Sequence, residues 1–245
     1  MSPEHPVWFT ALLNKLIGPA VVALLTRMGL HPNPTEPIPN YIAMQVLVFL
    51  LILAGALILR ARLSVEKPGK FQHLMEVFLQ FTESMCDDVI GHAGRRYVAL
   101  IGTLGLFVLL CNLLGIIPSF STATAAIYVP LGCAVVAFLY YNFHGMREHG
   151  VLGYLKHLSG PVWWLAWLIL PVEVISNTLR LLSLSVRLWA NMTVGELIEH
   201  VFTSLVPVLI PAIFVGLHVF VSFLQAYIFM ILPAVYISLA VSEEH

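Results

Sequence analysis

The chain has 245 residues, of which 59% are hydrophobic and only 10% are charged, and its mean hydropathy is +0.90. Soluble domains carry about 25% charged residues, so this composition excludes an ordinary soluble domain and indicates an integral membrane protein. A formal net charge of −1 argues against a nucleic-acid partner, and the three widely spaced cysteines fit neither a disulfide framework nor a metal site.

The N-terminal part, residues 1–40, is expected to form an outer-side or interfacial segment. The stretch from Met1 to Arg27 lacks the basic start and the cleavage site of a signal peptide. Its apolar residues recur at helical spacing, which predicts an interfacial helix that is broken near Gly18-Pro19. These residues are Trp8, Phe9, Leu12, Leu13, Leu16 and Ile17. A proline-rich linker, 31–40, follows.

Residues 41–245 are expected to form a single transmembrane helical domain with about five spans. A span of ~30 Å of hydrocarbon needs about 20 apolar residues. The predicted spans cover residues 41–59, 97–117, 125–143, 161–204 and 208–241.

The last two spans are too long to cross a membrane upright. As helices they would be roughly 50–65 Å long, so we expect them to tilt strongly, lie partly flat or kink. Pro171 and Pro233 are candidate kinks. Val206-Pro207 and Ile210-Pro211 are predicted to mark the hairpin turn between the two helices.

Two polar stretches interrupt this pattern. Residues 71–90 combine one apolar stripe with acidic residues, which predicts an amphipathic helix on the surface or against a partner. The stretch FHGMREHG, 143–150, is expected to be a loop, followed by an interfacial anchor of tryptophans. Nearby histidines could bind a metal, but their spacing favours a solvated loop. The residues are His144, His149 and His157, then Trp163, Trp164 and Trp167.

The distribution of positive charges predicts the orientation. If the chain starts outside, eight lysines and arginines fall inside and two fall outside. The inner ones are Arg60, Arg62, Lys67, Lys70, Arg95, Arg96, Arg147 and Lys156, and the outer ones are Lys15 and Arg27. We therefore expect the N-terminus outside and the C-terminal tail, 242–245, in the cytoplasm.

The stretch from Leu179 to His200 carries charges within an apolar segment. Each charge at membrane depth costs about 2.5–3.5 kcal/mol, and the guanidinium of Arg187 cannot lose its proton. Residues seven apart on a helix nearly superpose, so Arg187 shares a stripe with several polar side chains. They are Glu173, Ser176, Arg180, Ser183 and Asn191.

Folding the last two helices at a midpoint near Val206 places Arg187 level with Gln225, and Glu196 nearly level with His218. Glu173 then lies on the inner side of Arg187. This layout predicts two offset half-paths for protons, separated by a fixed cation that opposes a direct leak.

Structural roles remain open for several of these residues. Arg187 could form an ion pair with Glu173 or Glu196 that serves insertion alone, and Arg180 could extend to the inner surface. Ser176 and Ser183 are favoured as small residues that permit helix packing. Asn112 is favoured as a partner for backbone groups near Pro118, and Glu199 and His200 as solvated residues.

Three stretches closely resemble the signature of subunit a of F-type ATP synthases. They are NLLGIIP (112–118), SLSVRLWANMTVGELI (183–198) and LQAYIFMILPAVYISLA (224–240), and their order and spacing agree with the family. The resemblance covers roughly residues 40–245. One departure is Trp189-Ala190, where the family usually has Phe-Gly.

The resemblance implies a non-catalytic, proton-translocating stator subunit in a bacterial inner membrane, with no cofactor of its own. Its partners would be the rotating c-ring, whose buried carboxylates carry the protons, and the peripheral-stalk b subunits. The family's essential arginine falls on Arg187. Its outer half-channel positions fall on Asn191, Glu196, His218 and Gln225, and its inner carboxylate on Glu173, with Ser176 and Ser183 beside it.

Two other function classes would show different features in the sequence. A proton-coupled secondary transporter would show internal repeats and a broken helix, and neither is visible in the sequence. A haem or quinone subunit would need two histidines on facing helices at membrane depth, whereas only His218 is clearly placed there.

Overall fold

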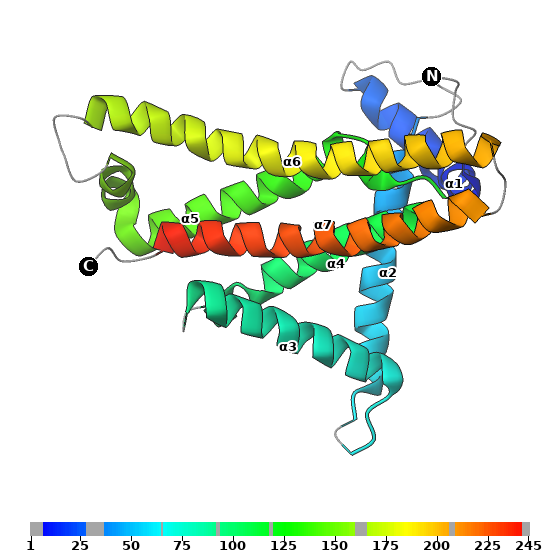
Figure 1. Cartoon of the computed structure of the whole chain (residues 1–245), viewed down its shortest axis with the longest axis horizontal. Coiled ribbons are helices and arrows are strands. Elements are labelled where there is room, and N and C mark those ends of the chain that lie inside the picture. Colours follow the sequence, from blue (N-terminus) through cyan, green and yellow to red (C-terminus); the bar gives the residue numbers. More distant parts are fainter. Residues whose placement is uncertain are drawn as a thin grey trace.

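The computed structural model describes residues 7–27, 37–64, 66–91, 94–117, 120–159, 166–205 and 209–241. Regular structure within these ranges is helical, which confirms the expected all-α class (Figure 1). The helices are α1 (Trp8–Arg27), α2 (Asn40–Arg62), α3 (Lys70–Ile90), α4 (Val98–Gly115), α5 (Tyr128–Ser159), α6 (Ala166–Leu205) and α7 (Leu209–Val241), with short 3-10 turns η1 (Gly94–Arg96) and η2 (Ala123–Ala125). Six helices in the described part, the expected five and α1, are long and apolar enough to cross a membrane.

Helix α1 is continuous, so the predicted break near Gly18-Pro19 is wrong. Gly18 is buried, and a Cβ built on it would lie 3.4 Å from the ring of Pro37. This is an ordinary van der Waals distance, so Gly18 lies where the following segment packs on α1 and does not end the helix. Pro19 lies on the exposed side of α1.

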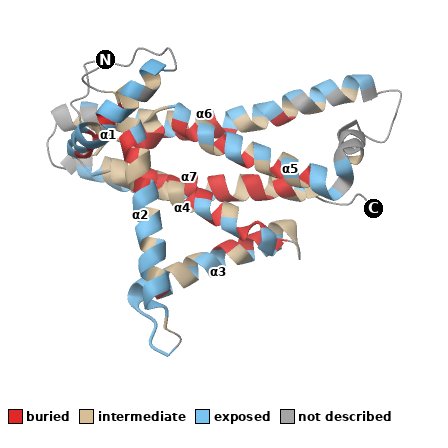
Figure 2. Cartoon of the chain, turned by 180° about the vertical axis from the view of Figure 1, so that it is seen from behind, coloured by how far each residue is buried: buried red, intermediate tan, exposed pale blue. Residues whose placement is uncertain are grey.

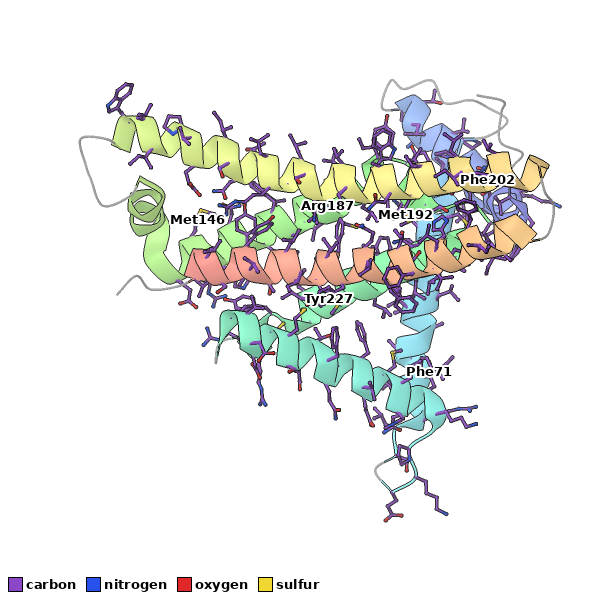
Figure 3. The ribbon with its side chains drawn as sticks, viewed as in Figure 1. Phe71, Met146, Arg187, Met192, Phe202 and Tyr227 are labelled. Atoms are coloured by element: carbon purple, nitrogen blue, oxygen red, sulfur yellow. The ribbon has the colours of Figure 1, made fainter. Side chains whose placement is uncertain are left out.

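The expected amphipathic helix is present as α3, but it packs against α4 and α7 of this chain, whereas the sequence placed it on the surface or against a partner. Its second half buries Met85 and Cys86, which join the residues of α4, α5 and α7 in one apolar cluster. Its first half is different, because Phe71 and Leu74 remain exposed (Figure 3). The apolar stripe is therefore covered by this chain over only part of its length.

Helix α5 continues through the stretch 143–149, so the predicted polar loop there is wrong. The backbone leaves helical geometry at Gly150, where φ is +71° and ψ is 162°. Glycine adopts positive φ without steric cost, which explains the position of the break. The ring of His144 packs on Tyr97 and Tyr140, at centroid distances of 5.2 and 4.2 Å, rather than lying in a solvated loop. The side chains of His149 and His157 lie outside the described residues.

Helices α6 and α7 lie side by side and antiparallel, and α2 runs across them rather than along them (Figure 1). Their 40 and 33 residues correspond to ~60 and ~50 Å of helix, well beyond the ~30 Å of hydrocarbon that α2 matches. This arrangement confirms the expected long hairpin. Both helices continue through Pro171 and Pro233.

The turn itself differs from the prediction. Pro211 lies in the first turn of α7, which begins at Leu209, so its expected place in the hairpin turn is wrong. Proline is tolerated there because the first helical N–H groups have no partner within the helix. Val206-Pro207, Trp163 and Trp164 lie outside the described residues, and Trp167 is exposed.

The core lies where α4, α5 and α6 meet α7, and Figure 2 shows buried residues concentrated there. One cluster joins α4, α5, α6 and α7 directly beneath the charged stretch of α6. Its buried members are Val108, Ala134, Leu184, Leu188, Met192 and Phe229. Because Leu184, Leu188 and Met192 point into this core, the stripe of α6 that carries Arg187 is turned away from it.

Candidate functional site

Arg187 lies midway along α6, with its side chain exposed (Figure 3). Ser183 and Asn191, one turn before and after it, are exposed as well. Among the described residues Arg187 forms no ion pair, so the structure does not use it to neutralise a carboxylate of this chain. A fixed cation on an open helix face is available to an anion supplied by a partner.

A cavity of about 430 Å³ lies along α6, between Arg187 and the N-terminal end of that helix. It is lined from α6 by Ser176, Arg180 and Ser183, and from α7 by Tyr236. Glu173 lies one turn further along α6, and its carboxylate oxygen is 3.8 Å from the Arg180 guanidinium. We call this space the inner cavity, because the orientation expected from the sequence would face it toward the cytoplasm.

Arg180 is held from two sides at the inner cavity. Besides its contact with Glu173, its guanidinium carbon lies 5.6 Å from the centre of the Tyr236 ring, within the range of a cation–π interaction. Both charged side chains are about one-third exposed, at 34% and 35%. This partial exposure, at the edge of the cavity, is typical of a hydrated pair of charges rather than of a buried ion pair.

A second cavity, of about 310 Å³, contains Glu196, which lies between Arg187 and the C-terminal end of α6. Two segments far apart in the sequence form its other walls, namely 38–41 and residues between 121 and 126 around η2. The backbone N–H of Thr122 donates a hydrogen bond to Glu196 Oε1 at 3.2 Å. We call this space the outer cavity.

A third cavity, of about 250 Å³, lies between α6 and α7 and is lined by Asn191, Gly195, His218 and Val221, among others. The His218 ring is buried, and a Cβ on Gly195 would lie 3.2 Å from it. Gly195 and Glu196 are consecutive but line different cavities, because successive helical residues point about 100° apart. We call this space the histidine cavity.

These contacts agree with the expected register of the hairpin. Gly195 and His218 are equally far from a midpoint between residues 206 and 207, and so, within one residue, are Asn191 and Val221. The same register places Gln225 level with Arg187. Gln225 is 4% exposed, and within the described residues its Oε1 has no hydrogen-bond partner. A buried amide oxygen left unpaired costs about 1–3 kcal/mol, so this residue has a reason other than stability to be there.

The structure also reveals contacts around η2 that the sequence did not predict. Thr124 Oγ1 donates a hydrogen bond to Asn112 Oδ1 at 2.6 Å within the buried interior, whereas Pro118, near which Asn112 was expected to act, lies outside the described residues. On the other side, Thr193 Oγ1 donates to the carbonyl of Ala125 at 3.3 Å. These two bonds hold the turn that presents Thr122 to Glu196. The feature of the sequence that could have indicated this turn is an asparagine in an apolar stretch that precedes a Ser/Thr run.

A substitution at Gly115 tests whether the position of this turn affects proton pumping. A Cβ at Gly115, the last residue of α4, would overlap Thr122 Oγ1 and lie 2.8 Å from the Thr122 Cα. We expect Gly115→Ala to displace Thr122 and its N–H from Glu196. Proton pumping driven by ATP should fall about 3- to 10-fold, which corresponds to ~0.7–1.4 kcal/mol in the barrier. Fluorescence quenching of an acridine dye in inverted membrane vesicles measures this rate.

Gly132→Ala is the matched control, because a Cβ there meets nothing within 4 Å. Both variants exchange glycine for alanine within a helix, where alanine is the better helix former by about 1 kcal/mol. Equal pumping by the two variants, at equal amounts of assembled protein, would show that the position of Thr122 is unimportant.

Comparison with known proteins gives one consistent result. The sequence model of the family described as "ATP synthase A chain" matches residues 42–238. The "ATP synthase subunit a" of Koribacter versatilis strain Ellin345 is 45% identical over 242 residues, covering 98% of this chain and 99% of the relative. That of Solibacter usitatus strain Ellin6076 is 44% identical over 234 residues, or 96% and 100% of the two chains. That of Geobacter sulfurreducens strain PCA is 38% identical over 241 residues, or 98% and 99%.

Proposed function

The chain belongs to the ATP synthase subunit a family, and on that premise we propose that it is the proton-translocating stator subunit of an F-type ATP synthase. In this proposal the chain supplies two half-channels and catalyses no reaction on ATP itself. The observation that carries it is the placement of cavities along α6. The inner cavity ends at Ser183, before Arg187, whereas the histidine and outer cavities begin beyond it.

Arg187 separates the two half-channels in this mechanism. A proton that enters through the outer cavity passes Glu196 and the His218 ring and reaches a carboxylate of the rotor. A carboxylate that arrives deprotonated is attracted to the Arg187 guanidinium, which keeps its charge at any working pH. The same charge repels a proton moving directly from one half-channel to the other.

The inner path leaves through the inner cavity. Ser176 and Ser183 offer hydroxyl groups that donate and accept hydrogen bonds, and Glu173 offers an acceptor at the inner end. Gln225, level with Arg187, is suited to hold the guanidinium, because its amide oxygen accepts a hydrogen bond without neutralising the charge.

The proposed rotor partner is a c-ring that lies against the open face of α6 and α7. This face carries exposed apolar side chains on both sides of Arg187, and they are Leu179, Val186, Val194 and Leu197 from α6 and Phe220, Phe223, Leu224 and Tyr227 from α7. Large apolar side chains left uncovered by their own chain suit lipid or a partner helix. The peripheral-stalk b subunits are the second proposed partner.

The proposed location is a bacterial inner membrane, with the N-terminus outside and the C-terminus in the cytoplasm. The positive charges that follow α2 and precede α4 support this orientation, since Arg60 and Arg62 end α2 and Arg95 and Arg96 form η1. With it, the outer cavity opens away from the cytoplasm and the inner cavity toward it.

Glu196 and His218 should act on the same half-channel. We expect Glu196→Leu and His218→Leu each to slow ATP-driven proton pumping, and the double variant to lose less than the sum of the two effects. Groups that share a path are energetically coupled, whereas distant groups are additive within about 0.3–0.5 kcal/mol. A double-mutant cycle on initial pumping rates in vesicles measures the coupling.

The control cycle pairs Glu196→Leu with Ser176→Ala, which lies in the inner cavity. The two residues line different cavities, so the effect of Ser176→Ala should be the same whether or not Glu196 is replaced. Additive losses for Glu196 and His218 would assign these residues to different paths.

A further inference from the structure

Helix α1 lies outside residues 42–238, the part of the chain that the sequence model of the family matches, and the function proposed above gives it no role. It packs against α2, and Figure 1 places it near the start of α2, which is also where residues 38–41 line the outer cavity. Phe9 and Leu13 of α1 are buried against Ile38 and Ala43. The helix is therefore packed on the polypeptide that leads into α2.

Asn14 of α1 holds that polypeptide by two hydrogen bonds to one residue. Its Nδ2 donates to the Ile38 carbonyl at 3.1 Å, and its Oδ1 accepts the Ile38 N–H at 3.0 Å. A third bond runs from the Val7 N–H to Asn40 Oδ1 at 3.4 Å. A side-chain amide that pairs with both backbone groups of one residue fixes its position and orientation, as a neighbouring strand would.

The segment held in this way is one wall of the outer cavity. Residues 38–41 line it opposite the turn 121–126 and Glu196. Ile38 lies outside helical structure and precedes α2, so neighbouring backbone bonds do not fix its amide and carbonyl. The Asn14 pair supplies the missing partners.

Helix α1 also contacts the second wall. The Trp8 ring meets Phe120 edge to face, with centroids 6.1 Å apart, immediately before the turn that carries Thr122. Beyond the turn, Tyr41 of the first wall stacks on Tyr128 at 5.9 Å. One helix thus contacts both walls of the cavity that contains Glu196.

We propose that α1 sets the width of the outer cavity and that Asn14 is a positioning residue for proton entry at Glu196. The proposal rests on the function proposed above. Asn14 touches no proton carrier; it fixes the wall segment 38–41 at its distance from the turn that donates to Glu196. Loosening that wall admits more bulk water and separates the polar groups that conduct a proton inward.

The main test uses Asn14→Leu, which keeps the shape of the side chain and removes both bonds to Ile38. The matched control is Thr26→Val on the same helix, because Thr26 is exposed and its Oγ1 bonds only to the Val22 carbonyl of its own helix in the described structure. Trp8→Leu is a second variant that acts on the other wall. Trp8 is 58% exposed, so its replacement leaves the packed interior intact.

The first measurement is the accessibility of the cavity. Cys86, Cys111 and Cys133 are replaced, and Ser121→Cys is labelled from the outer side with a membrane-impermeant maleimide in the assembled complex. We expect Asn14→Leu to speed labelling at least ~3-fold and Thr26→Val to leave it unchanged, since only the former releases the wall.

The second measurement is ATP synthesis in proteoliposomes driven by an imposed proton gradient, with the outer-side proton concentration varied. Asn14→Leu should raise the half-maximal proton concentration about 3- to 10-fold, while the maximal rate per assembled complex stays near that of the parent. A merely structural role would lower the maximal rate or the amount of complex and leave the half-maximal concentration unchanged. Unchanged labelling and an unchanged half-maximal concentration would overturn the proposal.

The outcome is separable from that of the proposed function. Normal pumping by Arg187→Ala would overturn the proposed function, while the labelling rate would still report whether α1 sets the cavity. If Arg187→Ala stops pumping and Asn14→Leu and Trp8→Leu behave as the parent, only the role given to α1 falls.

Discussion

Replacing Arg187 by alanine is expected to abolish ATP-driven proton pumping, even where the complex assembles normally. Arg180 and Arg187 are the basic residues in the sequences of α6 and α7 other than histidine, and Arg180 is engaged with Glu173 and Tyr236. Within these two helices no second fixed cation therefore lies at the depth of Arg187. In the proposed mechanism, an ionised rotor carboxylate would then have to enter an apolar interface unpaired, at a cost of several kcal/mol.

Two further substitutions sharpen this expectation. Arg187→Lys keeps a positive charge but loses the planar fork of donors and can release its proton in an apolar setting, so it should pump poorly. Arg180→Ala removes an arginine from the same stripe of the same helix and should keep a measurable part of the activity. The measurement is acidification of inverted vesicles on addition of ATP, normalised to assembled complex. Acidification by Arg187→Ala vesicles at the parent rate would contradict the proposed mechanism.

Sequence patterns predicted the helices best where long apolar runs end at charges. Helix α2 ends at Arg60 and Arg62, and α4 follows Arg95 and Arg96, so both lie close to the predicted spans. The hairpin register also followed from the sequence, because two long helices joined by a short turn must meet at equal distances from it. The contact of Gly195 with His218 agrees with this reasoning.

Local composition was a poorer guide where tertiary packing decides. The stretch 143–149 is polar, yet it remains helical because His144 packs on two tyrosine rings, and Gly150 ends it. Pro19 and Pro211 also lie within helices rather than ending them. Single-residue rules for breaks therefore fail where ring packing, as at His144, or the position within the helix, as at Pro211, decides the local structure.

The outer cavity could not have been predicted from the sequence in hand. Its walls come from segments around residues 40, 122 and 196. The residue pattern within one segment does not indicate which distant segments pack beside it. Thr122 acts through its backbone N–H, which every residue but proline carries, so its identity gives no signal. Arg187 and Glu196 were visible because charges stand out in an apolar helix, whereas the groups that hold them do not.

Filling the histidine cavity from Gly195 should be nearly as damaging as losing Arg187. A Cβ at this position would lie 3.2 Å from one ring atom of His218 and 3.4 and 3.6 Å from two others. Leucine adds three more carbon atoms, which must enter the cavity or push the ring aside. We expect Gly195→Leu to lower the ATP-driven pumping rate at least ~10-fold, or ~1.4 kcal/mol in the barrier. In the proposed mechanism, the added side chain blocks proton movement past the His218 ring, between Glu196 and the rotor.

Gly132→Leu is the matched control, since it adds the same side chain to an exposed position of α5 with open space around it. A cross-link separates obstruction from misfolding. A disulfide requires Cα atoms within about 7 Å. Asn191 and Val221 line the histidine cavity together, so with the three native cysteines removed we expect Asn191→Cys and Val221→Cys to form a disulfide in the parent.

The two readouts together decide what Gly195 does. If Gly195→Leu pumps at a tenth of the parent rate and the cysteine pair still cross-links, the hairpin is intact and the added side chain blocks proton movement. If pumping and cross-linking are lost together, overpacking, which typically costs about 1–3 kcal/mol, has forced the helices apart. Pumping at the parent rate with an intact cross-link would remove the histidine cavity from the proton path and leave Glu196 to reach the rotor by another route around α6.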